Sequence, residues 1–540
     1  MPNLNKRILI KSVIFYSKSR QQRRLLRSKR NKTPISSFTL VLNDNDMTFS
    51  YNKVILAVLG LMLACLTSCY EGHSFSSDPN HRLTFSTDTV TFDTLFTRVS
   101  SSTYSFLIYN NHDADLRITT AQLSGGDNSP YRVNIDGLSG SFFSDLTVRS
   151  SDSLFVFVEV TVDPRGQDNP FEVCDSLQFV LESGVTQQVQ LRAYGQDATI
   201  LRGLVVDNDM RLTSRRPYLI YDSLRIDEGA TLHLDAGTRL YFRDKVEMQV
   251  YGRIEAVGTK ESPIIFRGAR TDHMFSYLPY DRLSAQWGGI TLHETSTDNL
   301  FVHCDIHSGT YGLRAKSTDM STLKLTMQNS QIHNVDDDAL QLTLCTASFT
   351  NSIFSNAGGH CVNLLGGQMT FLHCTMANFY PWSSERGVAV NISNYDKDED
   401  AIYPLYGVNF INSIITGAKD DELMGSVLEK TDSADYSEYA QFAFTHSLIN
   451  SKGEARDPDT IHFSNIVWEH KDSTAYASTN FRTVDHSNFI YDFHLDSLSC
   501  ARGIASPEYI GISPYDKDEL QRHDTAPIDA GCYQYAAYEE

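Results

Sequence analysis

The side chains best suited to chemistry gather in two short stretches, HNVDDDALQL at residues 333–342 and GGHC at residues 358–361. Asp336, Asp337 and Asp338 are contiguous, and His360 follows Asp338 by 22 residues. Two carboxyl groups about 6.5–9.5 Å apart can cleave a glycosidic bond, one as general acid and one activating water. Repulsion among neighbouring carboxylates would raise the pKa of at least one of them. These four residues are the catalytic candidates, for hydrolysis of a polysaccharide.

The arrangement resembles the catalytic pattern of polygalacturonases, β-helical glycosidases with an Asp, then an Asp pair, then a Gly-His-Gly about one coil later. This chain departs from that pattern, because its three Asp residues are contiguous, Cys361 replaces the second Gly, and no basic motif follows. Neighbouring side chains on a strand point to opposite faces, so contiguous Asp residues cannot all converge. The alternative interpretation is an acidic, solvated turn.

A polysaccharide lyase is a further alternative, and it needs a base and a Ca²⁺ site formed by acidic residues on one sheet. The candidate bases Arg314, Lys316 and Arg386 are scattered and have no partnering Asp cluster. An enzyme of either kind is therefore weakly supported, and we expect a non-catalytic protein.

Two other groups of side chains could bind ligands. Exposed aromatic rings can stack on the flat faces of sugars, and the candidates are Phe379, Tyr380, Trp382, Tyr403 and Tyr406. Asp396, Asp398 and Asp400 alternate in NYDKDEDA, a spacing that lets carboxylates converge on Ca²⁺ in a loop. The Gly and closing Glu of an EF-hand are missing, so a solvated charge run is the alternative. No other cofactor is expected.

One short pattern recurs six times and must position these groups. It reads HCDIHS, NSQIHN, NSIFSN, HCTMAN, NSIITG and HSLINS, with starts 26, 22, 22, 39 and 34 residues apart. The copies begin at His303, Asn329, Asn351, His373, Asn412 and His446. A base period of 22 residues is too short for a two-helix repeat and is typical of a parallel β-helix with three short strands per coil.

The pattern also assigns directions to its side chains. We predict that Ile332, Phe354, Met376 and Ile414 stack inside the coil. Asn334, Asn356 and Asn378 are expected at a turn, where stacked Asn side chains form a hydrogen-bonded ladder. Cys304 and Cys374 occupy the slot that Ser330 and Ser352 fill in other copies, so they are predicted to be small inward residues.

The sequence predicts an all-β chain: an N-terminal immunoglobulin-like β-sandwich at residues 83–197, followed by a right-handed parallel β-helix at residues 198–451. Residues 452–540 are expected to form C-terminal coils and a cap over the last open coil. Short strands punctuated by Gly between Leu224 and Phe266, with QWGGI at residues 286–290, resemble the β-helix lipoproteins of Bacteroidetes-type bacteria, whose β-helix is pectin-lyase-like.

The N-terminal residues indicate export. Residues 47–68 read as a signal peptide whose last residues, with Cys69, look like a bacterial lipobox, which implies lipid attachment at Cys69. Residues 1–46 are a mis-assigned start or a basic extension, and residues 69–82 form a tether. Tyr70 after the lipid-bearing Cys favours the outer membrane and leaves open whether the body faces the periplasm or the exterior.

The net charge limits the classes of partner that this protein can bind. Residues 1–68 contain 12 of the 46 basic and 2 of the 66 acidic residues, which leaves a net charge of −30 on the remainder. Such a chain repels phosphate backbones, so nucleic acid is excluded as a partner. The expected partners are the membrane, through the lipid, and a polysaccharide or surface protein. The expected function is a glycan- or protein-binding surface module, with a polysaccharide hydrolase and a structural spacer as alternatives.

Overall fold

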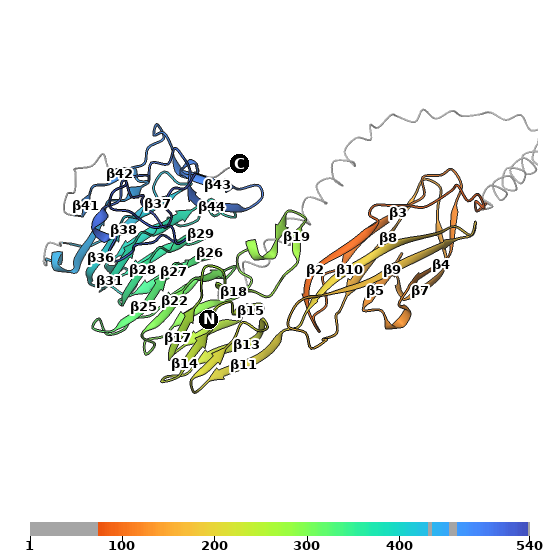
Figure 1. Cartoon of the computed structure of the whole chain (residues 1–540), viewed down its shortest axis with the longest axis horizontal. Coiled ribbons are helices and arrows are strands. Elements are labelled where there is room, and N and C mark those ends of the chain that lie inside the picture. Colours follow the sequence, from red (N-terminus) through yellow and green to blue (C-terminus); the bar gives the residue numbers. More distant parts are fainter. Residues whose placement is uncertain (1–73, 430–434, 453–461, 538–540) are drawn as a thin grey trace, which may run out of the picture. The chain divides into compact units, whose positions relative to one another are not determined.

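The computed structural model describes residues 74–429, 435–452 and 462–537, and the fold is all-β as predicted (Figure 1). The predicted N-terminal extension at residues 1–46, the predicted signal peptide, the predicted lipid attachment at Cys69 and residues 70–73 of the predicted tether lie outside the described residues. Within the described part of the chain, no helix is long and apolar enough to cross a membrane. The helical elements are single 3₁₀ turns: η1 (Gly126–Asn128), η2 (Tyr280–Arg282), η3 (Ser437–Tyr439), η5 (Ala477–Asn480) and η6 (Pro507–Tyr509).

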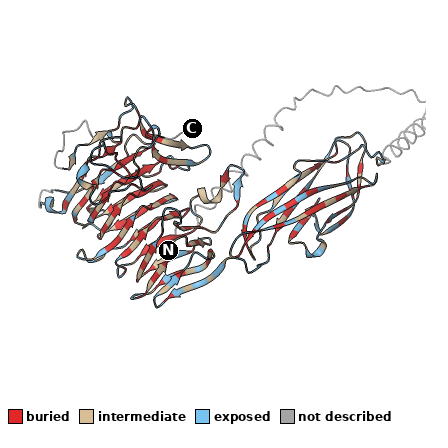
Figure 2. Cartoon of the chain, in the orientation of Figure 1, coloured by how far each residue is buried: buried red, intermediate tan, exposed pale blue. Residues whose placement is uncertain are grey.

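The first domain is a sandwich of two five-stranded sheets. One sheet has the order β1 (Thr84–Phe85), β3 (Tyr104–Tyr109), β8 (Ser153–Val160), β5 (Tyr131–Ile135), β6 (Leu138–Gly140). The other has the order β2 (Thr89–Phe96), β10 (Thr186–Gln196), β9 (Phe171–Leu181), β4 (Leu116–Leu123), β7 (Phe142–Val148). Apolar and polar residues alternate along these strands, so each sheet turns one apolar face to the shared core (Figure 2).

The second domain is a parallel β-helix whose coils contribute strands to three ladders, here named A, B and C. Ladder A contains β15 (Arg239–Phe242), β18 (Ile264–Gly268), β23 (Cys304–His307), β26 (Gln331–Val335), β29 (Ile353–Ala357), β32 (Thr375–Asn378), β37 (Ile414–Gly417), β40 (Leu448–Ile449) and β42 (Val467–Trp468). Ladder B contains β16 (Glu247–Val250), β21 (Gly289–Leu292), β24 (Leu313–Ala315), β27 (Leu340–Thr343), β30 (Val362–Leu365), β33 (Val390–Ser393) and β38 (Leu423–Ser426).

Ladder C is a separate ten-stranded sheet. It contains β12 (Met210–Leu212), β14 (Thr231–Leu234), β17 (Arg253–Val257), β22 (Asn299–Val302), β25 (Leu323–Gln328), β28 (Thr346–Thr350), β31 (Gly367–Leu372), β36 (Leu405–Ile411), β39 (Ala440–Thr445) and β41 (Phe463–Ser464). Ladders A and B share their first strands, β11 (Thr199–Val206) and β13 (Tyr218–Ile226). Three hairpins stand outside the coils: β19–β20 (His273–Phe275, Leu278–Pro279), β34–β35 (Tyr395–Asp396, Ala401–Ile402) and β43–β44 (Phe481–Asp485, Ile490–Leu495).

The first residue of every repeat copy lies at the corner between ladders C and A, in the left-handed backbone region. Its φ is between 48° and 52° in all six predicted copies and in a seventh, at Asn465, that the sequence pattern did not reveal. The pairing of the A strands aligns these residues in one column. Adjacent side chains in it bond to each other, as between Asn351 Nδ2 and Asn329 Oδ1 at 3.1 Å. Asn tolerates this conformation better than most residues, which explains its recurrence.

The interior of the solenoid is a continuous apolar column. Ile332, Phe354 and Met376 are buried in register, as predicted. The next residue in this column is Ile415, whereas Ile414 lies on the outer face of ladder A, because the fourth position of that copy is Ile415. A second column was not foreseen: the rings of ladder C two residues before each of the last five corners stack face to face, 4.5–5.0 Å apart, at Phe349, Phe371, Phe410, Phe444 and Phe463.

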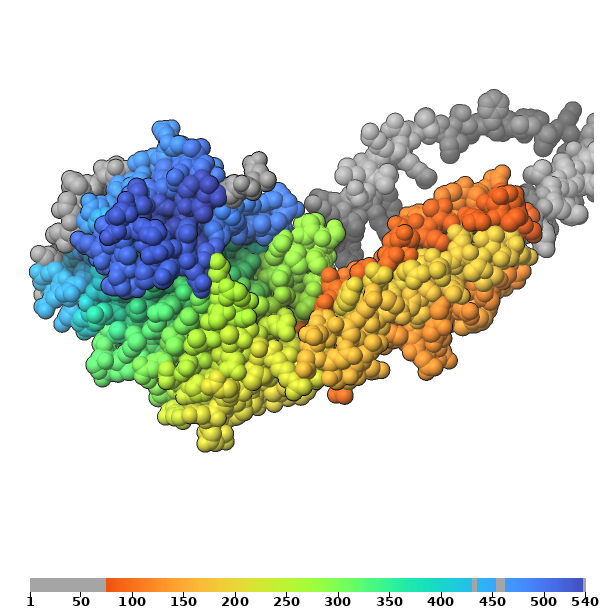
Figure 3. Space-filling model, in the orientation of Figure 1, coloured from red at the N-terminus to blue at the C-terminus, as the bar shows by residue number. Residues whose placement is uncertain are grey.

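The C-terminal segment lies along the outer face of ladder A. Apolar residues of hairpin β43–β44 and of residues 501–533 bury the outward side chains Ile353, Ile414 and Leu448. Ser506 bonds through its backbone to the Asn412 side chain, with N–H to Oδ1 at 2.8 Å. Figure 3 shows this segment in dark blue against the teal and green coils. We expected a cap over the last coil, and the described contacts instead run along the flank of several coils, because ladder A exposes apolar side chains there.

His494 joins two parts of this segment through its ring. Its Nδ1 contacts the Asp492 carboxylate, and its Nε2 lies 2.8 Å from Asp518 Oδ2. Burial opposes the charged imidazole, but the hydrogen bonds to Asp492 and Asp518 outweigh burial and raise the pKa of His494 to about 9. The protonated ring is therefore part of the folded state at neutral pH.

Asn351 tests the corner column. Asn351→Ala should lower the free energy of unfolding by about 3 kcal/mol, because it leaves the buried Arg522 without its Asn351 Oδ1 acceptor and places Ala at φ 49°. Asn351→Gly should cost about 1 kcal/mol less, since glycine adopts positive φ without strain. Urea denaturation measures both values, and equal losses in the two variants would show that corner conformation contributes nothing.

His494 makes stability depend on pH. Its folded-state pKa is raised, so its contribution is complete below the unfolded pKa of about 6.5 and disappears as the pH rises through about 9. Between pH 6 and pH 9.5, we expect wild type to lose about 2 kcal/mol more than His494→Gln. Urea titrations at the two pH values give this difference directly, and parallel pH profiles of the two proteins would contradict it.

Candidate functional site

The three predicted catalytic carboxylates point to three different partners. Asp336 Oδ1 accepts a hydrogen bond from the Tyr380 hydroxyl at 3.0 Å. Asp337 Oδ2 forms an ion pair with Arg314 Nη2 at 2.7 Å on the surface. Asp338 is buried, and its carboxylate bonds to His360 and Asn363. These residues lie in the turn between β26 and β27, and their carboxylates bond to separate groups, so the three do not meet at one point.

Asp338 and His360 do lie on adjacent coils, as the 22-residue spacing predicted. Asp338 Oδ1 accepts the backbone N–H of His360 at 2.7 Å, and Asp338 Oδ2 accepts from Asn363 Nδ2 at 2.6 Å. The His360 ring faces the next coil, where its Nδ1 accepts the backbone N–H of Val388 at 3.0 Å. Burial raises the pKa of Asp338 and lowers that of His360. These bonds connect three successive turns of the solenoid, and the predicted catalytic role of these residues stays a prediction.

The predicted aromatic group does not form one exposed surface. Phe379 is buried between ladder A and the C-terminal segment, and Tyr380 is buried with its hydroxyl on Asp336. Trp382 is exposed and stacks on Phe489 at 4.5 Å. Tyr403 bonds to Glu399 at 2.5 Å, and Tyr406 lies exposed on β36 of ladder C. The first two rings are buried, Phe379 against the C-terminal segment and Tyr380 with its hydroxyl bonded to Ser284 and Asp336, so neither is exposed to a ligand.

The predicted Ca²⁺ loop folds on itself. Asp396 Oδ1 accepts the backbone N–H groups of Asp398 and Glu399, at 2.8 and 3.2 Å, in the turn of hairpin β34–β35. Asp400 Oδ1 accepts from the Tyr395 hydroxyl at 2.6 Å. Asp396, Asp398 and Asp400 form no ligand cluster among the described residues. The charge run is a hairpin turn, which corrects the predicted metal residues.

A cavity of about 330 Å³ lies between ladder A and hairpin β43–β44. Its floor is the outer face of three coils, and its remaining walls come from η2 and the hairpin. The lining combines carboxylate, amide and imidazole groups with the side chains Phe489, Ile490, Tyr491 and Phe493. Nine of its fourteen lining residues are polar or charged and three are aromatic, a combination that can bind a small polar ligand.

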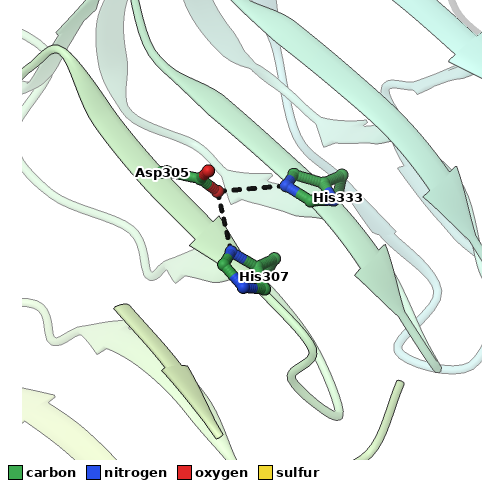
Figure 4. A group of neighbouring side chains, drawn as sticks. All are labelled: Asp305, His307 and His333. Carbon is green, nitrogen blue, oxygen red and sulfur yellow. Dashed lines mark hydrogen bonds and ion pairs between the residues drawn. The ribbon is translucent and has the colours of Figure 1, made fainter. Parts of the chain in front are cut away.

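Asp305, His307 and His333 form the polar centre of this cavity (Figure 4). Asp305 Oδ1 accepts from His307 Nδ1 at 2.8 Å and from His333 Nε2 at 3.0 Å. The two rings stack with their centroids 4.9 Å apart. Gln331 Nε2 donates to the second carboxylate oxygen, Asp305 Oδ2, at 2.8 Å. The carboxylate is thus held in one orientation by three side chains.

The electrostatics of this cluster favour an ionised carboxylate. Burial opposes ionisation of Asp305, but the facing His307 and His333 outweigh burial and hold the pKa of that carboxyl well below its usual value. Burial lowers the pKa of His307, against the attraction of Asp305. A charged carboxylate only accepts hydrogen bonds, so His307 Nδ1 carries a proton in this arrangement.

The sequence contained the signal for this cluster. Asp305 and His307 are the third and fifth residues of HCDIHS, and His333 is the fifth residue of NSQIHN. Positions on either side of an inward fourth residue must point outward on a strand. Aligning the two copies by their corner residues therefore places His307 beside His333. The prediction from contiguous acidic residues missed this pair.

Comparisons with known proteins give no family. No protein-family model matches the chain, and no curated protein matches it. Solved structures similar to part of it include a family 123 glycoside hydrolase from Clostridium perfringens, with 6% identity, coverage of 21% of this chain and 25% of that chain, and a TM-score of 0.16.

Two other partial matches are smaller or uncharacterised proteins. A PapD-like domain of human CEP192 is 14% identical over 24% of this chain and 94% of that chain, with a TM-score of 0.16. A protein of unknown function from Porphyromonas gingivalis W83 is 13% identical over 24% of this chain and 58% of that chain, with a TM-score of 0.17. Such partial likenesses support no conclusion about function.

Substitution of Asp338 tests whether its carboxylate stabilises the fold. Asp338→Asn should lower the free energy of unfolding by about 2 kcal/mol. The new side chain has an NH₂ group in place of Oδ2, so it cannot accept the hydrogen bond from Asn363 Nδ2. Asn363 cannot compensate by turning its amide, since its Oδ1 already accepts from Asn391. The matched control Asp337→Asn removes an exposed ion pair and should change stability by less than about 0.5 kcal/mol. Thermal unfolding compares them, and equal effects would refute the structural role.

Proposed function

We propose that this protein is a lipid-anchored cell-envelope module whose β-helix binds a neutral glycan in the cavity beneath hairpin β43–β44. The observation that carries the proposal is the composition of that cavity, in which aromatic side chains face a polar floor. Sugars present apolar C–H faces and a rim of hydroxyl groups, so they need both kinds of wall. The amide of Gln331 and the carboxylate of Asp305, which both line the floor, can bind the hydroxyl groups.

The charge of the chain supports a neutral glycan over an acidic one. The cavity lining includes two acidic residues, Asp281 and Asp305, and one Arg, Arg282, and the protein after residue 68 carries a net charge of −30. A polymer rich in carboxylates or sulfates would be repelled at long range. A neutral oligosaccharide of one to three sugars suits a cavity of about 330 Å³.

The proposed location follows from the N-terminal sequence. The signal peptide at residues 47–68 and the lipobox ending at Cys69 imply a diacylated Cys and a body tethered to the membrane surface. Tyr70 favours the outer membrane. In this proposal the chain is an outer-membrane lipoprotein of the Bacteroidetes type with a pectin-lyase-like β-helix, and its cavity faces soluble or surface glycans.

Divergence of the acidic residues supports binding over hydrolysis. A hydrolase needs two carboxyl groups that face each other across the scissile bond, and Asp336 and Asp337 instead turn to Tyr380 and Arg314. Asp338 is occupied by His360 and Asn363. The polysaccharide hydrolase is therefore an alternative outcome of the test below, as is a structural spacer without a small ligand.

A glycan array followed by titration of the hits tests the proposal. We expect wild type to bind neutral oligosaccharides without releasing reducing ends, and Tyr491→Ala to weaken binding about tenfold, because stacking on one ring contributes about 0.5–1.5 kcal/mol. The matched control Tyr406→Ala removes an exposed ring on β36, outside the cavity, and should leave binding unchanged. Both variants are compared by titration calorimetry.

Each other outcome has a defined meaning. Release of reducing ends that is lost in Asp337→Asn would replace the binding module with a hydrolase. Binding that weakens equally in Tyr491→Ala and Tyr406→Ala would place the ligand outside the cavity and reject the site. No binding and no release across neutral glycans would leave a spacer and reject the proposal.

A further inference from the structure

We propose that Asp305, His307 and His333 form a binding site for a divalent transition metal, with Zn²⁺ as the best fit. One ligand atom from each residue lies within 4.8 Å of the other two. They form the one group of three such side chains found among the described residues. The inference goes beyond glycan binding and does not depend on it.

The backbone fixes all three side chains on one rigid surface. Asp305 and His307 are separated by one inward residue on β23, so both point outward. The parallel pairing of β23 with β26 places His333 directly opposite His307. Ligands on adjacent strands of a packed solenoid need no loop to close around the ion, so the site is preorganised.

The donor set selects the metal. Two imidazole nitrogens with one carboxylate oxygen are typical ligands of zinc and of non-haem iron, with further positions open to solvent. Ca²⁺ and Mg²⁺ prefer oxygen ligands alone, so the two rings disfavour both ions. The positions and spacing of the three residues therefore indicate a transition metal, in contrast to the Ca²⁺ expected at Asp396.

The distances fit a small adjustment around the ion. Asp305 Oδ1 lies 2.8 Å from His307 Nδ1 and 3.0 Å from His333 Nε2. Zn²⁺ with bonds of about 2.0–2.1 Å in a tetrahedron separates its ligand atoms by about 3.3 Å. Shifts of a few tenths of an ångström in the side chains would suffice, and the metal would replace the protons that now bridge these atoms.

Neighbouring groups supply the outer support that metal sites require. Gln331 Nε2 holds the second oxygen of Asp305 at 2.8 Å, which orients the carboxylate toward the rings. Asp281 lines the same cavity, and its Oδ1 is buried without a hydrogen bond among the described residues. Its other oxygen pairs with Arg267 at 3.1 Å. A cation would therefore relieve an excess of buried acceptors in this cavity.

Metal binding by the full chain tests the inference directly. After chelator treatment and dialysis, the purified protein is titrated with Zn²⁺ alone, in the absence of any glycan, by calorimetry. We expect one ion per chain and a rise in Tm with added Zn²⁺. His333→Ala should weaken affinity at least about 100-fold, and Gln331→Leu about tenfold, because it only orients a ligand.

A matched control excludes adventitious binding to surface histidines. His446→Asn removes a histidine from the corner column, where Asn occupies the same place in other coils, and should leave the affinity unchanged. X-ray absorption of the wild-type complex should show two imidazole nitrogens, a readout that needs no variant to fold. The inference fails if wild type binds no ion stoichiometrically, if His333→Ala retains full affinity, or if the absorption spectrum shows oxygen ligands only.

The two proposals can fail separately. Glycan titration in excess chelator measures the cavity without metal, and the Zn²⁺ titration measures the metal without glycan. Zinc binding without glycan binding would support the metal site and reject the module. Glycan binding in excess chelator, without zinc binding, would support the glycan-binding module and reject the metal site.

Discussion

The left-handed backbone at the corner between ladders C and A fixes the register of the seven coils from His303 to Asn465. A shift of one residue would move a β-strand's apolar side chains from the core to the surface, and it would also force an ordinary residue into the left-handed region. Asn or His occupies each of the seven corner positions. Their side chains bond along the column and, at Asn351 and Asn412, to the backbone of the C-terminal segment. One column of residues therefore aligns the coils and attaches the layer that covers them.

Much of the fold could be predicted from the sequence because the corner residues recur at a recognisable spacing. The 22-residue period of the copies at Asn329, Asn351 and His373 predicted the coil. The alternation of apolar and polar residues in the N-terminal strands predicted the sandwich. The seventh corner, at Asn465, escaped because its copy keeps the Asn but not the small residue that follows it in the other six. The path of the C-terminal segment was not predictable either, since its contacts join residues hundreds of positions apart, such as Arg282 and Asn488.

The cluster of Asp305, His307 and His333 was harder to predict, because a run of contiguous acidic residues is more conspicuous in the sequence. Asp336, Asp337 and Asp338 are conspicuous as a run, yet they lie in the turn between β26 and β27, where each carboxylate bonds to a different partner. Asp305 and His307 are less conspicuous, but their alternate spacing places them on one face. In a solenoid, residues converge when they share a position in successive coils, so repeat alignment is more informative about sites than proximity along the chain.

The route of the C-terminal segment has a consequence for the order in which the protein becomes functional. Hairpin β43–β44 supplies the roof of the cavity, yet it comes about 150 residues after the floor in the chain. Coils can form in order along the chain, because each pairs with its predecessor. The binding cavity exists only after the final residues emerge and dock. A molecule that has lost its final residues would keep its stacked coils but expose an apolar flank in place of the cavity, so an intact cavity indicates a complete chain.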